Sequence, residues 1–142
     1  MKLLTFLTSL IAVLPVRGDS GDDTLKYYLS KSDRVVVGKI TSDPIGIVDE
    51  SFAPHYTCEF QVQDVLKGEG KLKGQVIKID ISRFEMDAKD KHPLIKKDGE
   101  CILFLKIAAP DTPSWVTADI WFGVQYPSRS MVRSLKRLAV EK

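Results

Sequence analysis

The chain has 142 residues, with 21 lysines and arginines against 19 acidic residues and a formal net charge of +2. This length suits one domain that buries a sizeable core without extra cross-links. The near balance of charge excludes a general electrostatic attraction to nucleic acid or to anionic membranes.

The first 18 residues predict a secretory signal peptide. Lys2 gives a positive start, Leu3–Leu14 is uncharged and mostly apolar, and Gly18 ends a short segment of the kind that signal peptidase cleaves. The apolar run has 12 residues, fewer than the roughly 20 that cross a bilayer. A core helix and an uncleaved anchor are the alternatives. We expect residues 1–18 to be removed and one domain, 19–142, to be exported to the periplasm or the extracellular space without a membrane anchor.

Periodicity predicts the elements of the first part of this domain. Asp22–Ser32 predicts a short helix, because its apolar residues share one face. Arg34–Thr41 is rich in valine and predicts a strand. Gly38 within it predicts a bulge or a tight bend. Ser42–Pro54 contains two prolines and a glycine, and therefore predicts a loop.

Four further segments predict strands. Tyr56–Val65 and Gln75–Ile81 alternate between apolar and polar residues, the period of a strand with one buried face. Cys101–Ile107 is nearly apolar on both faces, which predicts a central strand. Ser114–Phe122 predicts the last strand. The sequence Lys-Asp-Gly at 97–99 is a turn signal.

The C-terminal segment predicts a helix that Ser128 or Ser130 would cap. Its cations fall largely outside an apolar stripe, which predicts a solvated outer face, and a binding patch is the alternative. Five strands between two short helices favour a mainly β fold, best matched by a five-stranded, partly open Greek-key barrel of the OB-fold type. Another small β-barrel would have the same strand count. The apolar stripe consists of Met131, Val132, Leu135, Leu138 and Ala139.

The order of these segments resembles that of the tissue inhibitors of metalloproteinases and related netrin-like domains. Ser32–Ile40 is similar to their valine-rich opening strand, and Tyr56–Val65, closed by Leu66–Gly68, is similar to their second strand. Gly99–Leu105 resembles their glycine-led strand. Asp119–Gly123, followed by a serine-capped helix, resembles the end of their inhibitory domain. The resemblance implies an OB-fold barrel flanked by helices.

Inhibition of proteases follows less directly from this resemblance. In the animal inhibitors the mature chain begins with the first cysteine of a Cys-x-Cys motif, and the amine and carbonyl of that residue chelate the protease zinc. No cysteine lies near Asp19 in this chain. The resemblance therefore implies a divergent member without the Cys-x-Cys motif. A metalloprotease inhibitor that acts through its mature N-terminus remains an alternative, with a protease as its partner.

Two cysteines, Cys58 and Cys101, fall on predicted strands among inward-facing residues. An oxidising compartment would permit a disulfide between them. Two buried, unpaired thiols are the alternative. No close second pair of ligands accompanies either cysteine, which argues against a zinc site.

The sequence offers no catalytic constellation. It lacks a Gly-x-Ser-x-Gly elbow, a His-Glu-x-x-His helix and a phosphate-binding glycine loop. Asp87, Asp90 and His92 form the most compact ligand-like group, but Lys89 and Lys91 between them favour a solvated loop. We expect no enzymatic activity, no metal and no cofactor.

Single-stranded nucleic acid is a further candidate ligand, because OB-folds bind it through aromatic side chains and a basic groove. Trp115, Trp121, Phe122 and Tyr126 supply the aromatic side chains. Against this stand the export signal and the neutral mature domain. Removal of residues 1–18 leaves 19 basic and 19 acidic residues.

The function that remains is that of a secreted protein-interaction module whose partner is another protein. Loops carry recognition while the barrel supplies rigidity. The candidate surfaces are the loops Ser42–Pro54 and Ser82–Pro93 and the rim near Trp115 and Trp121. A purely structural domain without a small ligand would have the same pattern.

Overall fold

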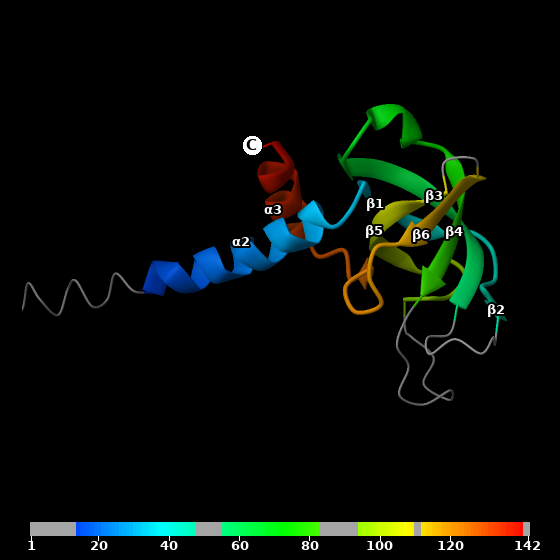
Figure 1. Cartoon of the computed structure of the whole chain (residues 1–142), viewed down its shortest axis with the longest axis horizontal. Coiled ribbons are helices and arrows are strands. Elements are labelled where there is room, and N and C mark those ends of the chain that lie inside the picture. Colours follow the sequence, from blue (N-terminus) through cyan, green and yellow to red (C-terminus); the bar gives the residue numbers. More distant parts are fainter. Residues whose placement is uncertain (1–13, 48–54, 83–93, 110–111, 141–142) are drawn as a thin grey trace, which may run out of the picture.

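A computed structural model describes residues 14–47, 55–82, 94–109 and 112–140 of the chain. Within these residues, a closed barrel of five strands forms the centre and carries two further short strands and two α-helices (Figure 1). The mainly β barrel with flanking helices expected from the sequence is thereby confirmed. The barrel strands are β1 (Arg34–Ile40), β3 (His55–Lys67), β4 (Val76–Ser82), β5 (Glu100–Ala109) and β6 (Thr112–Thr117).

The barrel closes in the order β1-β3-β4-β6-β5, and β5 pairs back with β1. The β4–β6 pair is parallel, and the other pairs of this circuit are antiparallel. A short 3-10 helix, η1 (Gly70–Leu72), lies in the connection between β3 and β4. Closure leaves the five barrel strands without a long open edge, which is how small all-β folds avoid pairing with other chains.

Alternation along the strands fills the barrel. Phe60 and Val62 of β3 point inward and are buried, as are Ile79 and Ile81 of β4. Strand β5 differs, because residues 101–105 are all buried. One of its faces belongs to the barrel core and the other to a second core under the helices. The prediction of a central strand with two apolar faces is therefore confirmed.

The helices α2 (Leu14–Ser30) and α3 (Arg129–Val140) lie on the same side of the barrel (Figure 1). They cover the second core, in which Leu29, Leu135 and Leu138 pack with Ile102 and Phe104 of β5. Within the part of the chain that the structure describes, no helix is both long and apolar enough to cross a membrane.

Helix α2 is longer than the segment Asp22–Ser32 predicted from the sequence. Its described part begins at Leu14 and includes Pro15. Asp19, the predicted mature start, lies inside this helix.

Strand β2 (Ile45–Ile47) corrects part of the prediction of a largely irregular segment over Ser42–Pro54, of which residues 48–54 lie outside the described residues. It pairs antiparallel with the start of β3, with Ile45 opposite Thr57. The pairing of β1 with β3 stops where Ile40 faces Phe60. The first residues of β3 therefore keep an open edge, and the short apolar strand β2 occupies it.

The second correction concerns the predicted strand Ser114–Phe122. Strand β6 ends at Thr117, a turn follows, and β7 (Val124–Gln125) then pairs with β5. Asp119 starts this turn: its carboxylate accepts a hydrogen bond from the backbone N–H of Trp121 at 2.6 Å. Such a side-chain-to-backbone contact mimics a backbone turn and ends the strand.

Two local predictions are confirmed. The pairing of β1 with β3 shifts register between Val37 and Gly38, which is a bulge at the predicted glycine. A Cβ at Gly38 would overlap the carbonyl oxygen of Gln61. Ser128, rather than Ser130, caps α3, because its Oγ accepts a hydrogen bond from the N–H of Met131 at 3.2 Å.

Candidate interaction surface

The structure places the two predicted rim residues, Trp115 and Trp121, in different settings. Trp115 on β6 is half-buried and packs against the barrel core. Trp121 lies on the turn between β6 and β7, and 71% of its surface is exposed. The two indoles therefore differ in how far a partner could reach them.

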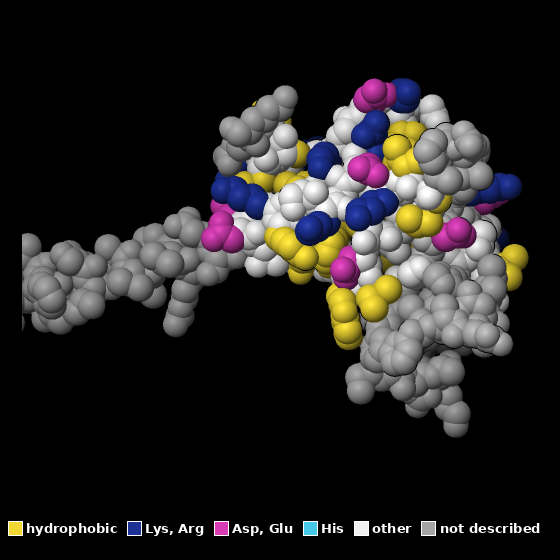
Figure 2. Space-filling view, viewed as in Figure 1, with side chains coloured by type: hydrophobic (Ala, Val, Ile, Leu, Met, Phe, Trp, Pro, Cys, Tyr) yellow, Lys and Arg dark blue, Asp and Glu magenta, His cyan; other side chains and the backbone are white. Residues whose placement is uncertain are grey.

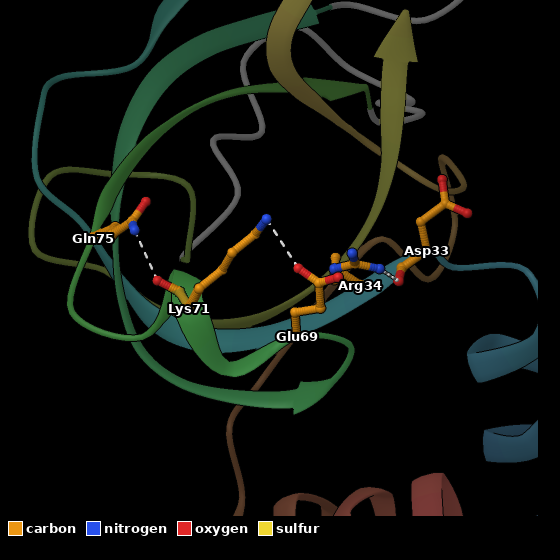
Figure 3. Close-up of polar contacts among 5 residues, drawn as sticks. All are labelled: Asp33, Arg34, Glu69, Lys71 and Gln75. Carbon is orange, nitrogen blue, oxygen red and sulfur yellow. Dashed lines mark hydrogen bonds and ion pairs between the residues drawn. The ribbon is translucent and has the colours of Figure 1, made fainter. Parts of the chain in front are cut away.

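A cation covers Trp115. The guanidinium carbon of Arg34 lies 5.9 Å from the centre of the indole ring. The Arg34 side chain also crosses Gly68, where a Cβ would overlap its Cδ atom. Its Nη1 donates a hydrogen bond to the carbonyl oxygen of Asp33 at 2.8 Å (Figure 3). These contacts hold the cation over the ring and give Trp115 a packing role.

Charged side chains beside Arg34 largely compensate one another. Lys71 Nζ lies 3.0 Å from Glu69 Oε2, and Gln75 Nε2 donates to the Lys71 carbonyl oxygen at 2.8 Å (Figure 3). The hydrogen bond and positive charge of Lys71, with the further charge of Arg34, lower the pKa of Glu69. This end of the barrel thus carries a solvent-exposed ion pair between Lys71 and Glu69, next to Arg34.

The turn that carries Trp121 is fixed at both ends. The N–H of Ala118 donates to the carbonyl oxygen of Phe104 at 2.7 Å, and the N–H of Phe104 donates to Gly123 at 2.9 Å. Gly123 also donates to the Asp119 carbonyl oxygen at 3.0 Å. A Cβ on Gly123 would lie 2.5 Å from that oxygen, so the tight turn requires glycine. The backbone of this turn is therefore held against β5.

A cluster of aromatic side chains in the second core packs against the same turn. Phe122 is buried, and its ring stacks on that of Tyr28 at 4.2 Å. It also meets the edges of Phe104 at 5.7 Å and Tyr27 at 6.1 Å. Contacts of this kind between rings add to the free energy gained by burial. The residue next to Trp121 is thus anchored in the second core.

Tyr27 extends the exposed aromatic area from the turn to α2. It is 54% exposed, and the ammonium group of Lys31 lies 5.6 Å from its ring centre. Tyr27 contacts Phe122, which is the neighbour of Trp121 in the turn. The buried Phe122 ring therefore supports both the exposed Tyr27 ring and the Trp121 turn. Figure 2 shows hydrophobic side chains gathered along one side of α2 and over the β6–β7 connection. Tyr27 and Trp121 together are called the Trp121 surface below.

Cys58 and Cys101 lie in the barrel interior, where burial keeps both thiols unreactive. Cys58 and Cys101 are both buried, and the structure has both as free thiols. Burial, with the negative charge of Asp80, raises the pKa of Cys58 to about 12. Burial, with the neighbouring Cys58, raises the pKa of Cys101 to about 12. Neither thiol is activated as a nucleophile. The disulfide that the sequence permits stays a prediction.

Other ligand sites are equally unsupported. Among the described residues, no group of three His, Cys, Asp or Glu side chains could hold a metal ion. Asp87, Asp90 and His92 lie outside the described residues, as does nearly all of the predicted loop Ser82–Pro93.

A cleft of about 460 Å³ separates α2 from α3. Leu25, Tyr28 and Met131 contribute apolar surface to it. Several of its polar side chains already have partners: Ser128 caps α3, Asp22 binds Arg137 and Gln125 donates to the Phe122 carbonyl oxygen. These side chains are therefore engaged within the protein and do not converge on the cleft to orient a small ligand.

Sequence reasoning identified Trp121 but missed Tyr27 and the turn. Asp119 and Gly123 were the available signals, since both residue types favour turns. A scan against models of protein families found no match, and a search of curated proteins found none either. The resemblance to netrin-like domains accordingly stays a prediction.

Proposed function

We propose that this protein is an exported, non-enzymatic protein-interaction module that binds its partner through the Trp121 surface. The observation that carries the proposal is an indole that is 71% exposed on a turn hydrogen-bonded at both ends to Phe104. Tryptophan and tyrosine are enriched among the residues that dominate binding energy in protein interfaces. A side chain on a fixed backbone loses less conformational entropy when a partner covers it.

Export is supported by the N-terminal segment, with Lys2, the apolar run Leu3–Leu14 and Gly18. Netrin-like kinship is supported by the four matching segments and by a barrel of the type that such kinship requires. Both remain parts of the proposal. Intact mass of the protein from the medium of exporting cells tests the first part: a start near Asp19 is expected, and a retained Met1 would contradict it.

The polar outer face of β3 and β4 favours a protein over single-stranded nucleic acid as the partner. In OB-folds this face is a common site for oligonucleotides. Here the outward residues of 57–63 and 76–82 include no aromatic ring on which a base could stack. Thr57 Oγ1 instead donates a hydrogen bond to Asp80 Oδ1 at 2.9 Å, and Glu59 faces Lys78.

Site-specific photo-crosslinking in exporting cells tests the proposal. A benzophenone side chain replaces Trp121 in one variant and Lys78, an exposed residue of β4, in the matched control. We expect a discrete protein adduct from position 121 and none of the same mass from position 78. Excess wild-type protein should suppress the adduct, and excess Trp121→Ser protein should not. Equal adducts from both positions, or equal competition by both proteins, would refute the Trp121 surface as the binding site.

A further inference from the structure

Helix α3 has an unusual charge composition. Its 12 residues include four cations and no acidic residue. At about 100° per residue these cations cluster on one side of the helix, opposite the buried Leu135 and Leu138. The capping bond from Ser128 and the packing of these leucines fix the helix against β5, so its outer face is held in place. The four cations are Arg129, Arg133, Lys136 and Arg137.

This arrangement is unfavourable for the helix itself. Arg129, Arg133 and Arg137 follow one another at intervals of four residues, and like charges at this spacing repel. Arg129 is also the first residue of α3, where the positive end of the helix dipole disfavours a cation. Acidic residues in the first turn would have stabilised the helix instead. Departures from such local rules tend to mark functional sites.

Neighbouring elements compensate half of this charge. Arg137 Nη2 lies 3.0 Å from both carboxylate oxygens of Asp22, and Lys136 Nζ lies 2.8 Å from Asp64 Oδ2. The hydrogen bond from Lys136 lowers the pKa of Asp64. Arg129 and Arg133 are exposed and form no ion pair with any residue that the structure describes. Two adjacent guanidinium groups of one row therefore face solvent.

We propose that the two uncompensated cations of this row, Arg129 and Arg133, bind an extended acidic segment of a partner protein. Four residues of an α-helix advance about 6 Å along its axis. Alternate side chains of an extended chain repeat at about 6.8 Å on one side. Carboxylates two residues apart therefore reach successive arginines, and the forked guanidinium group suits a carboxylate. The proposal concerns a different surface from that of Trp121 and does not depend on it.

Fluorescence anisotropy with the full chain tests this inference. The probe is a labelled peptide of alternating glutamate and threonine, and the matched peptide alternates lysine and threonine. The variant Arg129→Gln/Arg133→Gln is compared with Lys78→Gln/Lys106→Gln, which removes the same charge from exposed barrel positions. We expect the acidic peptide to bind, with an affinity that drops about tenfold in the helix variant. The barrel variant and Trp121→Ser should bind it like the wild type.

Other results of this experiment would contradict the inference. No binding of the acidic peptide at low salt, or the same loss in both double variants, would overturn the inference. A single-stranded oligonucleotide that binds more tightly than the peptide through the same arginines would also overturn it, in favour of nucleic acid. Misfolding is separately checked by thermal unfolding. Removal of the repulsion on α3 should leave the melting temperature of the helix variant unchanged or raised.

Discussion

The ammonium nitrogen of Lys67 lies 2.6 Å from the carbonyl oxygen of Leu29. It donates a second hydrogen bond to the carbonyl oxygen of Ser32, also at 2.6 Å. Lys67 is the last residue of β3, and the two carbonyls lie at the end of α2 and just beyond it. One cation thus binds two carbonyl oxygens at the C-terminal end of the helix, where the helix dipole favours positive charge. It joins the barrel to the helix that carries Tyr27.

Substitution of Lys67 tests this link. Lys67→Met keeps the length of the side chain and removes both hydrogen bonds, so the free energy of unfolding should fall by about 1.5–3 kcal/mol. Lys71→Met is the control, since Lys71 is exposed and should contribute less than about 1 kcal/mol through its ion pair with Glu69. Urea denaturation measures both values. Similar small losses would mean that Lys67 does not anchor α2.

The register of β3 is tested by two adjacent residues. Phe60 is fully buried in the barrel core, and Gln61 faces outward. Phe60→Ala should lower the free energy of unfolding by about 3–5 kcal/mol, because it removes buried surface and leaves a cavity. Gln61→Ala should have little effect. If denaturant titrations showed similar losses in the free energy of unfolding for both variants, the inward orientation of Phe60 and the outward orientation of Gln61 would be wrong.

The bulge of β1 makes a sharp prediction for a small substitution. A Cβ at Gly38 would overlap the carbonyl oxygen of Gln61 in β3. Gly38→Ala should therefore destabilise the protein by about 1–3 kcal/mol through strain. Gly70 has open space at the same position and serves as the control. Calorimetry should show a lower melting temperature for Gly38→Ala than for Gly70→Ala, and the reverse order would contradict the bulge.

The barrel thiols give a prediction for pH. The pKa of Cys58 and of Cys101 is about 12 in the folded protein, whereas a thiol in an unfolded chain titrates near about 8.5. The folded state therefore holds more protons between these values. The contribution of these thiols to stability should be constant below about pH 8 and should be lost as the pH rises through about 9 to 12. Denaturant titrations across this range measure the effect.

Alkylation supplies an independent measure of the same burial. Iodoacetamide reacts with thiolates, so Cys58 and Cys101 should react slowly in the native protein at pH 8.5 and rapidly in urea. The conditions are reducing, which keeps a bridge from forming. Rapid labelling of the native protein would contradict the closed barrel.

The rigidity of the Trp121 turn can be measured by fluorescence. Trp115→Phe leaves Trp121 as the sole tryptophan. We expect red-shifted emission, because the indole is exposed, and an anisotropy decay dominated by tumbling of the whole protein. Gly123→Ala should add fast local motion, since its Cβ would crowd the Asp119 carbonyl oxygen. Fast motion already present with Gly123 in place would argue against a fixed turn.

Much of the barrel could be predicted because the residue patterns that specify its strands lie within each strand. Alternation in β3 and β4, the double apolar character of β5 and the lone Gly38 in β1 each correspond to a feature of the structure. Strand β2 could not be predicted in this way. Its three residues form a strand only because β1 leaves the start of β3 unpaired, which depends on residues distant in the sequence.

The candidate surface was only partly predictable for a related reason. Ile120, Trp121 and Phe122 are apolar residues in a row, and so they suggested a strand. Asp119 and Gly123 favour a turn, but whether a turn forms at these residues depends on the two hydrogen bonds to Phe104. The role of Tyr27 depends on the position at which Phe122 packs. The sequence of α2 alone does not show this position.

The affinity of the crosslinked partner for the Trp121 variants tests the account most directly. Isothermal titration calorimetry with the purified partner would compare the wild type with Trp121→Ser and with Lys78→Ser. Loss of a central aromatic anchor should weaken binding by at least about 2 kcal/mol, or roughly thirtyfold, for Trp121→Ser alone. Equal affinity of Trp121→Ser and wild type, with the fold intact, would contradict the proposal that this indole is the binding anchor.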